Sequence, residues 1–224
     1  MKYLYETHVH TSESSRCGQN SAAAQVRTYK KRGYTGIIIT DHFVHGCWRY
    51  LPLPWEVKMK HVAAGYRAAK KEGIKCDLDV FFGWEFTVDG NDFLTYGLDI
   101  DFLLGHPNLD KLSLPEYSHL VRGVGGYIAQ AHPYRNRANK GNKLPVDPKF
   151  LDGIEVYNAL DARSANNANG KALAFAKAHN LPMQAGSDSH GVDIPIVSGI
   201  KLGKRAENIF DIIEAIKVKK VELI

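Results

Sequence analysis

The sequence predicts an α/β fold in which a parallel sheet is covered by helices on its outer side. Short stretches of nearly continuous apolar residues, such as GIIIT at 36–40, are typical of strands buried on both faces. They alternate with longer segments whose apolar residues recur at helical spacing. A chain of 224 residues, 44% of them hydrophobic, is long enough for one domain with a substantial core. A doubly wound sheet satisfies the same pattern.

Each element has its own signal in the sequence. The first strand is expected to begin near Lys2 and to run into ETHVH, where apolar and polar residues alternate. The first helix is expected from Asn20 to Arg32, with Gly33 as its end, and a second helix from Trp55 to Glu72, with Gly73 as its end. Further strands are expected at 36–40, 79–86, 93–98, 127–131, 153–157, 183–187 and 199–202, and further helices at 115–122, 165–179 and 206–219.

The composition predicts a single domain over residues 1–224 and a cytoplasmic location. The N-terminus lacks the features of a signal peptide, and no apolar run approaches the ~20 residues that a membrane span needs. Cys17, Cys47 and Cys76 are odd in number and form no C-x-x-C pair, so reduced thiols are expected.

The net charge of +5 is spread over helical segments and one loop. A solvated surface explains most of it, whereas an anionic substrate is the more specific explanation for the loop. The loop cluster consists of Arg135, Arg137, Lys140 and Lys143.

Histidines and carboxylates gather where the predicted strands end. His8 and His10 end the first strand one residue apart, so both side chains point the same way. In a closed parallel barrel the C-terminal strand ends share one face, where the active sites of such barrels form. Residues far apart in the sequence are therefore expected to converge there. The other members of this group are His42, His132, His190, Asp41, Glu85 and Asp188.

This combination of imidazoles and carboxylates, with no cysteine in the set, suits Zn, Mn or Fe. A carboxylate such as Glu85 can bridge two ions, which a single histidine cannot, so more than one ion is expected. Any one histidine alone would be explained by a hydrogen-bonded structural role. Five at strand ends, with acidic residues beside them, favour metal binding.

The motifs ETHVHT, GIIITDH, GWE, AHPYR and GSDSH, in this order, resemble those of the polymerase and histidinol phosphatase (PHP) family of metal-dependent phosphoesterases. The resemblance implies a distorted (β/α)7 TIM-like barrel with two or three divalent metal ions. It implies one ion at His8, His10, Glu85 and Asp188, a second at Glu85 and His132, and a third at His42 and His190.

The sequence departs from the family pattern at two positions. The family often has a histidine shortly after its motif glutamate, where this chain has Asp92; this carboxylate is included as a ligand, with a turn aspartate beside Gly90 and Asn91 as the alternative. The first motif of the family commonly continues into a ligand of the third metal, whereas this chain reads SESSRCGQ. Glu13 and Cys17 are the possible substitutes, and occupancy of the third site stays open.

Two further carboxylates near strand ends are kept out of the metal set. Asp41 is next to His42 on a strand and should point the opposite way, which favours a structural role or one that orients a ligand. Glu155 in GIEVYN matches no ligand position of the family pattern.

The resemblance implies hydrolysis of phosphate monoesters of small molecules by a metal-activated hydroxide, as in histidinol phosphatase. Asp188, His190 and His132 are the expected catalytic residues. Phosphate recognition calls for guanidinium groups or backbone donors, and Arg135 in AHPYR is the first candidate, with Arg163 and Arg49 as weaker ones.

Other functions of the family keep the same site. A 3'-5' exonuclease or phosphodiesterase acting on nucleotides is one alternative, although no aromatic and basic stripe suited to single-stranded nucleic acid is visible. A non-catalytic metal-binding domain and a protein phosphotyrosine phosphatase are two others. The expected partner is a small phosphorylated substrate, with no membrane, and the oligomeric state is left open.

Overall fold

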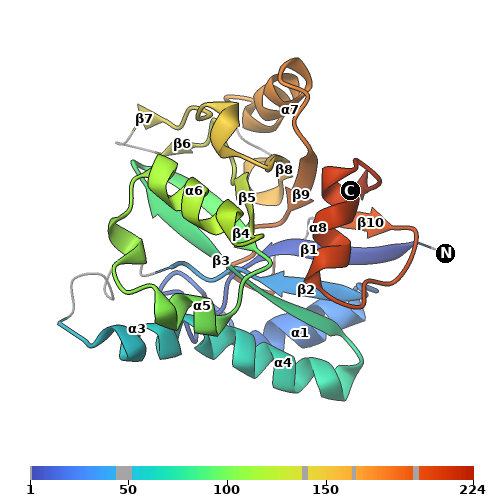
Figure 1. The fold of residues 1–224 in the computed structure, drawn as a ribbon. Helices are drawn as coiled ribbons and strands as arrows, with labels where there is room; N and C mark the ends of the chain where they lie inside the picture. Colours follow the sequence, from blue (N-terminus) through green and yellow to red (C-terminus); the bar gives the residue numbers. More distant parts are fainter. Residues whose placement is uncertain (1, 44–51, 138–140, 163–164, 194–196) are drawn as a thin grey trace.

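The computed structural model describes residues 2–43, 52–137, 141–162, 165–193 and 197–224. Figure 1 shows the strands at the centre of the molecule and the helices around them. The strands are β1 (Tyr3–Val9), β2 (Gly36–Ile39), β3 (Asp79–Val88), β4 (Asn91–Tyr96), β5 (Tyr127–Gln130), β6 (Asn136–Arg137), β7 (Gly141–Asn142), β8 (Gly153–Asn158), β9 (Met183–Gly186), β10 (Ile200–Leu202) and β11 (Glu222–Leu223). The helices are α1 (Ala22–Lys31), α3 (Trp55–Val62), α4 (Ala64–Cys76), α5 (Ile100–Gly105), α6 (Leu114–Gly123), α7 (Ala168–Ala178) and α8 (Ile209–Lys217).

The main sheet curves into a nearly closed barrel. Its strand order is β11-β10-β1-β2-β3-β4-β5-β8-β9, so β1 and β9 are the strands that must meet to close the ring. They meet through a parallel bridge between Val9 and Ser189, next to which the His10 N–H donates to Ser189 O at 2.9 Å. Glu6 Oε1 ties the same two segments together, because it accepts the N–H groups of His8 (3.0 Å) and Ser187 (2.8 Å). The TIM-like barrel expected from the sequence is therefore confirmed.

The expectation of an all-parallel sheet is wrong at three strands. β4 pairs antiparallel with both β3 and β5, and β10 and β11 extend the sheet antiparallel beyond β1. Asp89 and Gly90 are the cause at β4, since they form the whole connection from β3 and both have positive φ, at 50° and 75°. A two-residue turn of this type joins a hairpin, whereas a parallel crossover needs about a dozen residues or more.

The predicted helices are present, with one difference in the second. Ser21 caps α1, and the helix ends before Gly33. The segment predicted as one helix from residue 55 is divided at Ala63, and α4 continues past Gly73 to Cys76. Gly73 is buried, and a Cβ there would lie 2.7 Å from Val80 Cγ2 in β3. This glycine therefore allows close packing of α4 on the sheet instead of ending the helix.

Apolar side chains fill the spaces between the sheet and the helices in three clusters. One cluster lies around Trp84 and Tyr117, the second between β1 and α8 around Ile212, and the third between β2 and the helices α1 and α4 around Val26 and Ile39. The long apolar stretches of the strands are thus buried as their composition predicts. None of the helices in the described part of the chain has the length and apolar character needed to cross a membrane.

The first cluster contains a hydrogen-bonded aromatic group directly behind the strand that carries Glu85. Tyr117 stacks on Phe86 with ring centroids 3.8 Å apart. Its hydroxyl lies 2.7 Å from Trp84 Nε1, which donates to it, and 2.7 Å from Thr95 Oγ1. All of these groups are buried, so each depends on the others for its hydrogen bonds.

We expect Tyr117→Phe to lower the free energy of unfolding by about 1–3 kcal/mol, because it leaves the Trp84 N–H buried without its acceptor. Urea unfolding measures the loss. Tyr3→Phe is the matched control, since Tyr3 is only half-buried, and it should change the free energy by less than about 0.5 kcal/mol. Equal effects of the two substitutions would contradict this account.

Candidate metal centre

The barrel brings together the residues that the sequence predicts as ligands. They come from β1, from the middle of β3 and from the segments that follow β1, β2, β5 and β9. His42 and Glu85 also pair directly, through a parallel bridge between their backbones. The residues that converge are His8, His10, His42, Glu85, His132, Asp188 and His190.

Two of these residues have a left-handed backbone conformation. His132 has a φ of 31° and Asp188 a φ of 55°. This conformation costs a non-glycine residue about 1–3 kcal/mol and is concentrated at functional sites. A surrounding contact holds His132 in it, since its backbone N–H donates to Glu155 Oε2 at 2.9 Å. Because the fold maintains this unfavourable backbone conformation at both residues, it supports a functional role for their side chains in the centre.

His8, His10 and Asp188 form the first group of ligand atoms. Their distances are 3.1 Å between the two Nε2 atoms, 3.4 Å from His8 Nε2 to Asp188 Oδ1, and 3.1 Å from His10 Nε2 to the same oxygen. Nitrogen and oxygen ligands about 2.0–2.2 Å from one ion lie about 3–3.5 Å from each other. All three side chains are buried. This group fits a divalent metal ion in both spacing and chemistry.

Glu85 connects the first group with two others. Its Oε1 lies 2.9 Å from His132 Nε2 and 3.6 Å from His8 Nε2, which makes a second group of ligand atoms. Its Oε2 lies 2.7 Å from His42 Nδ1 and 3.6 Å from His10 Nε2. The two oxygens of one carboxylate therefore face different histidines, as a bridging ligand requires.

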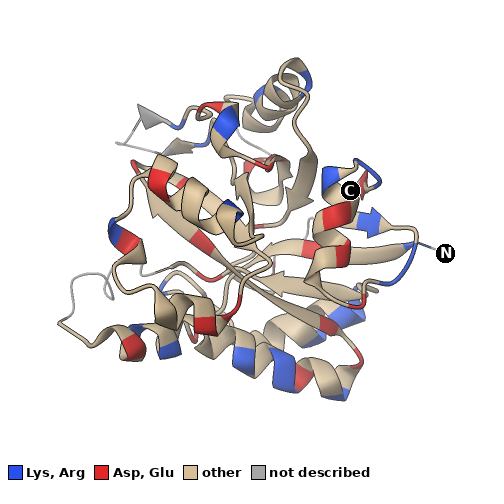
Figure 2. Ribbon diagram, in the orientation of Figure 1, with Lys and Arg blue, Asp and Glu red and all other residues tan. Residues whose placement is uncertain are grey.

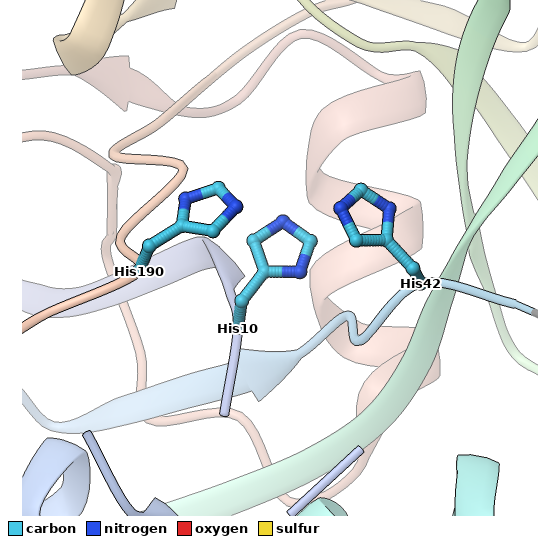
Figure 3. Close-up of side chains that lie close together, drawn as sticks. All are labelled: His10, His42 and His190. Carbon is cyan, nitrogen blue, oxygen red and sulfur yellow. The ribbon is translucent and has the colours of Figure 1, made fainter. Parts of the chain in front are cut away.

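His10, His42 and His190 form the third group. Figure 3 shows the three rings side by side with His10 in the middle. The centroid of the His10 ring lies 4.5 Å from that of His42 and 4.3 Å from that of His190. A ligand atom of each of the three histidines lies within 4.8 Å of the others.

The buried carboxylates and imidazoles shift each other's pKa values. Burial favours the neutral ring of His8, but Asp188, Glu155 and Glu85 outweigh it and raise the pKa of His8 to about 10. Burial and the neighbouring His42 lower the pKa of His10 to about 3. Two adjacent imidazoles therefore differ in charge, and the proton on His8 supplies positive charge where a metal ion would.

Glu85 and Asp188 stay ionised although they are buried. Burial opposes their charge, but His42, His132 and His8 hold the pKa of Glu85 well below its usual range. For Asp188, His8 and Arg135 outweigh burial and hold its pKa low as well. The Arg135 Nη1 donates to Asp188 Oδ2 at 2.6 Å, while its Nε donates to Asp161 and its Nη2 to Asn158. The centre therefore offers two carboxylates that can bind cations.

Glu155, which sequence reasoning kept out of the metal set, holds two of the histidines in place. Its Oε1 lies 3.0 Å from His8 Nδ1, and its Oε2 accepts the N–H of His132. Asn158 Nδ2 donates to the same Oε2 at 2.8 Å. A carboxylate on the outer nitrogen of a histidine orients the inner nitrogen toward a metal. A charged residue between Ile154 and Val156 of a buried strand was the signal in the sequence.

Asp41 lies outside the three groups of ligand atoms but holds the third group in place through hydrogen bonds. This agrees with the orienting role expected from the sequence. It accepts hydrogen bonds from Thr11 and, at 2.6 Å, from Ser15 Oγ. The same Ser15 Oγ lies 3.3 Å from His10 Nδ1 and accepts the backbone N–H of His42 at 3.0 Å. Asp41 thus acts on His10 and His42 through one serine.

Asp92 lies beside the second group. Its Oδ2 is 3.9 Å from His132 Nε2 and pairs with the ammonium of Lys143, while its Oδ1 accepts a hydrogen bond from Thr87 at 2.7 Å. Lys143 is buried, and its Nζ lies 3.4 Å from His132 Nδ1. Arg135 and Lys143, two residues of the basic loop, therefore both pair with carboxylates in or beside the centre.

Glu13 is turned away from the centre, because both of its carboxylate oxygens accept the N–H of Ala22 at the start of α1. Arg49 and Arg163, the weaker candidates for substrate binding, lie outside the described residues, as does Lys140 of the basic loop.

We expect Glu155→Gln to weaken metal binding about 10–100-fold, the usual cost of losing a partner of a ligand histidine. Competition with a fluorescent chelator measures the affinity. Glu214→Gln on the exposed face of α8 is the control and should bind as the unchanged protein does. An unaltered affinity in Glu155→Gln would mean that this carboxylate does not orient His8.

Metal binding should release protons, because a ligand imidazole must be neutral. His8 has a pKa of about 10 without metal and is therefore charged at neutral pH. A proton thus competes with the ion, and apparent affinity should rise between about pH 6 and pH 8. Calorimetric titrations in two buffers of different ionisation enthalpy count the protons. Heats that do not depend on the buffer would contradict the expectation.

Solved structures of other proteins share this fold. A two-domain protein from Bacteroides vulgatus containing a predicted PHP-like metal-dependent phosphoesterase has a TM-score of 0.72 and 15% identity; the alignment covers all of this chain and 65% of that one. An amidohydrolase from Chromobacterium violaceum, with bound sulfate and no metal, has a TM-score of 0.55 and 15% identity over 98% of both chains. The lesion-specific endonuclease EndoQ from Pyrococcus furiosus has a TM-score of 0.61 and 14% identity, over all of this chain and 58% of that one.

These structural similarities establish the fold. This chain spans less than two thirds of the length of the Bacteroides and Pyrococcus proteins. Comparison with curated proteins gave no match. The PHP domain family matches residues 6–180, which include all the ligand candidates except Asp188 and His190. The chain therefore belongs to the PHP domain family.

Proposed function

We propose that this protein hydrolyses phosphate monoesters of small molecules, with chemistry similar to that of histidinol phosphatase. The position of Glu85 is the observation that carries the proposal. Its Oε1 lies 2.9 Å from His132 Nε2 in the second group and its Oε2 lies 3.6 Å from His10 Nε2 in the first, so one carboxylate faces both groups. Two divalent ions held by such a shared ligand would supply the chemistry of two-metal phosphoester hydrolysis.

In this proposal the residues divide among two or three divalent ions, with Zn, Mn and Fe as candidates. The imidazole and carboxylate donors suit these metals. One ion would be held by His8, His10, Glu85 and Asp188, a second by Glu85 and His132 with Asp92 beside them, and a third by His42 and His190.

Bound divalent ions supply Lewis acidity and make water nucleophilic near neutral pH. Asp188 contributes by holding charge, because its low pKa makes it a poor proton donor. Burial and the cations Arg135 and Lys143 lower the pKa of His132, which keeps that ring in the neutral form of a ligand. We therefore assign Asp188, His132 and His190 to the reaction as groups that hold the ions against the phosphoryl group.

Arg135 is the proposed phosphate-binding residue. Its side chain is 16% exposed, and Asp161 and Asn158 fix two sides of the guanidinium while Nη1 points to Asp188. A guanidinium that is held at the edge of the centre can donate to phosphate oxygens without losing further freedom.

A nuclease function is the second candidate, supported by the same fold in the Pyrococcus endonuclease. The distribution of charge favours a small substrate instead. In the view of Figure 2, Lys and Arg are spread over several helices, with acidic residues among them. A groove for single-stranded nucleic acid would need these charges in one band along the centre.

Protein loaded with Mn or Zn should release phosphate from one class among sugar, amino-alcohol and nucleotide monoesters. Asp188→Ala should reduce the rate more than about 100-fold, since even partners of a metal ligand contribute 10–100-fold. A colorimetric phosphate assay gives both rates. Folded, metal-loaded protein that cleaves only an oligonucleotide, or no ester at all, would overturn the monoester proposal.

Arg135→Lys keeps the charge but removes the fork of donors. We expect kcat/KM for the hydrolysed monoester to fall about tenfold or more, equivalent to about 1.5–3 kcal/mol for a hydrogen bond to a charged group. Arg122→Lys is the control, because this exposed residue of α6 pairs with Asp152 away from the centre. Equal values of kcat/KM in the two variants would argue against phosphate binding by Arg135.

A further inference from the structure

The third group of histidines is bordered by the segment that follows β1, and hydrogen bonds fix this segment at two points. Ser15 Oγ accepts the backbone N–H of His42 at 3.0 Å. The N–H of Gln19 donates to His190 O at 2.6 Å. The residue midway between these points is Cys17, which is therefore held between the two histidines.

A tight turn keeps Cys17 in this position. The N–H of Gly18 donates to Ser15 O at 2.9 Å. A Cβ on Gly18 would lie 2.4 Å from both the carbonyl carbon and the oxygen of Thr11, so no other residue fits there without moving the backbone. The thiol of Cys17 hydrogen bonds with the rings of both His42 and His190. It is also exposed to solvent, so an ion can reach it.

His10, the third member of this group, already has contacts on both ring nitrogens. Its Nδ1 lies 3.3 Å from Ser15 Oγ, and its Nε2 lies 3.1 Å from Asp188 Oδ1 in the first group. His42 and His190 therefore need a different third ligand. Glu13, the other candidate in the altered motif, is bound to the start of α1. Cys17 contacts both rings and offers a further ligand atom.

We propose that Cys17, His42 and His190 form a zinc-selective site with one thiolate and two imidazole ligands. The inference rests on the proposed function, since it concerns the third ion of the same centre. Sulfur is a soft ligand that selects Zn over Mn, whereas the carboxylates and imidazoles of the other groups accept both. Three protein ligands leave the fourth tetrahedral position of zinc open, as in catalytic zinc sites.

Cobalt(II) alone is the probe for this site, because a thiolate ligand gives cobalt a charge-transfer absorption in the near ultraviolet. The cobalt-loaded protein should show this band, and Cys17→Ser should lose it. Cys76→Ser is the matched control and should keep the band, because Cys76 ends α4 within a different part of the fold. The double variant Cys47→Ser, Cys76→Ser leaves Cys17 as the sole thiol, and it should also show the absorption band. Absence of the band from the unchanged protein, or its survival in Cys17→Ser, would overturn the inference.

Metal analysis by mass spectrometry gives a second readout. Cys17→Ser should lose about one zinc ion per chain after zinc loading, with no change in manganese bound after manganese loading. An unchanged zinc count would again overturn the inference. Circular dichroism confirms that the variant is folded.

Failure of the proposed function would look different. Protein that shows the cobalt band but hydrolyses no phosphate monoester would overturn the monoester proposal and leave the thiolate site intact. Monoester hydrolysis by protein that shows no cobalt band would overturn the thiolate site and leave the monoester proposal intact. Folded protein that binds no ion at all would overturn both.

Discussion

Two buried carboxylates, Glu85 and Asp188, must be surrounded by positive charge, and the arrangement of the centre follows from this requirement. An isolated buried carboxylate would take up a proton, because burial strongly disfavours the charged form. Here imidazoles and the guanidinium of Arg135 keep both pKa values low. The histidines in turn are fixed by other polar groups, such as Glu155 on His8. Removal of any member therefore leaves an uncompensated buried group, which makes the centre a cooperative unit.

Much of the fold could be predicted from periodicity and turn residues. The apolar strands and amphipathic helices were found near their predicted positions, and the candidate ligands lie together at the strand ends. The direction of β4 was missed although its cause is local, in the Asp89–Gly90 turn. The role of Gly73 could not be predicted, because the close approach of Val80 in β3 depends on how α4 packs against the sheet.

The site was predictable where the sequence repeats a family motif and less so elsewhere. Glu155 follows no ligand pattern, and its function depends on contacts with β1 and with His132 that only the closed barrel creates. The choice between Glu13 and Cys17 likewise depends on where α1 begins relative to the strand ends. Both residues are equally plausible ligands in the sequence, but only Cys17 reaches His42 and His190.

The centre is closed on one side and open on the other. The side chains of His8, His10 and His132 are at most 2% exposed, whereas those of His42 and His190 are 12% and 21% exposed. Lys143 covers the His132 side as a buried ammonium. Solvent therefore reaches the centre from the side of His42 and His190. An ion held there would exchange faster with solution than one beside His8.

The closure of the barrel between β1 and β9 also bears on how the protein is made. Glu6 and Ser187, which join the two strands, are 181 residues apart in the chain. His8 and His10 are synthesised before β9, and Asp188 completes their group only after β9 has docked. A growing chain on the ribosome consequently carries an unfinished pair of imidazoles until the segment after β9 has been made. Metal capture at the first group would thus follow folding, and an ion bound there would link the first strand to the segment after β9.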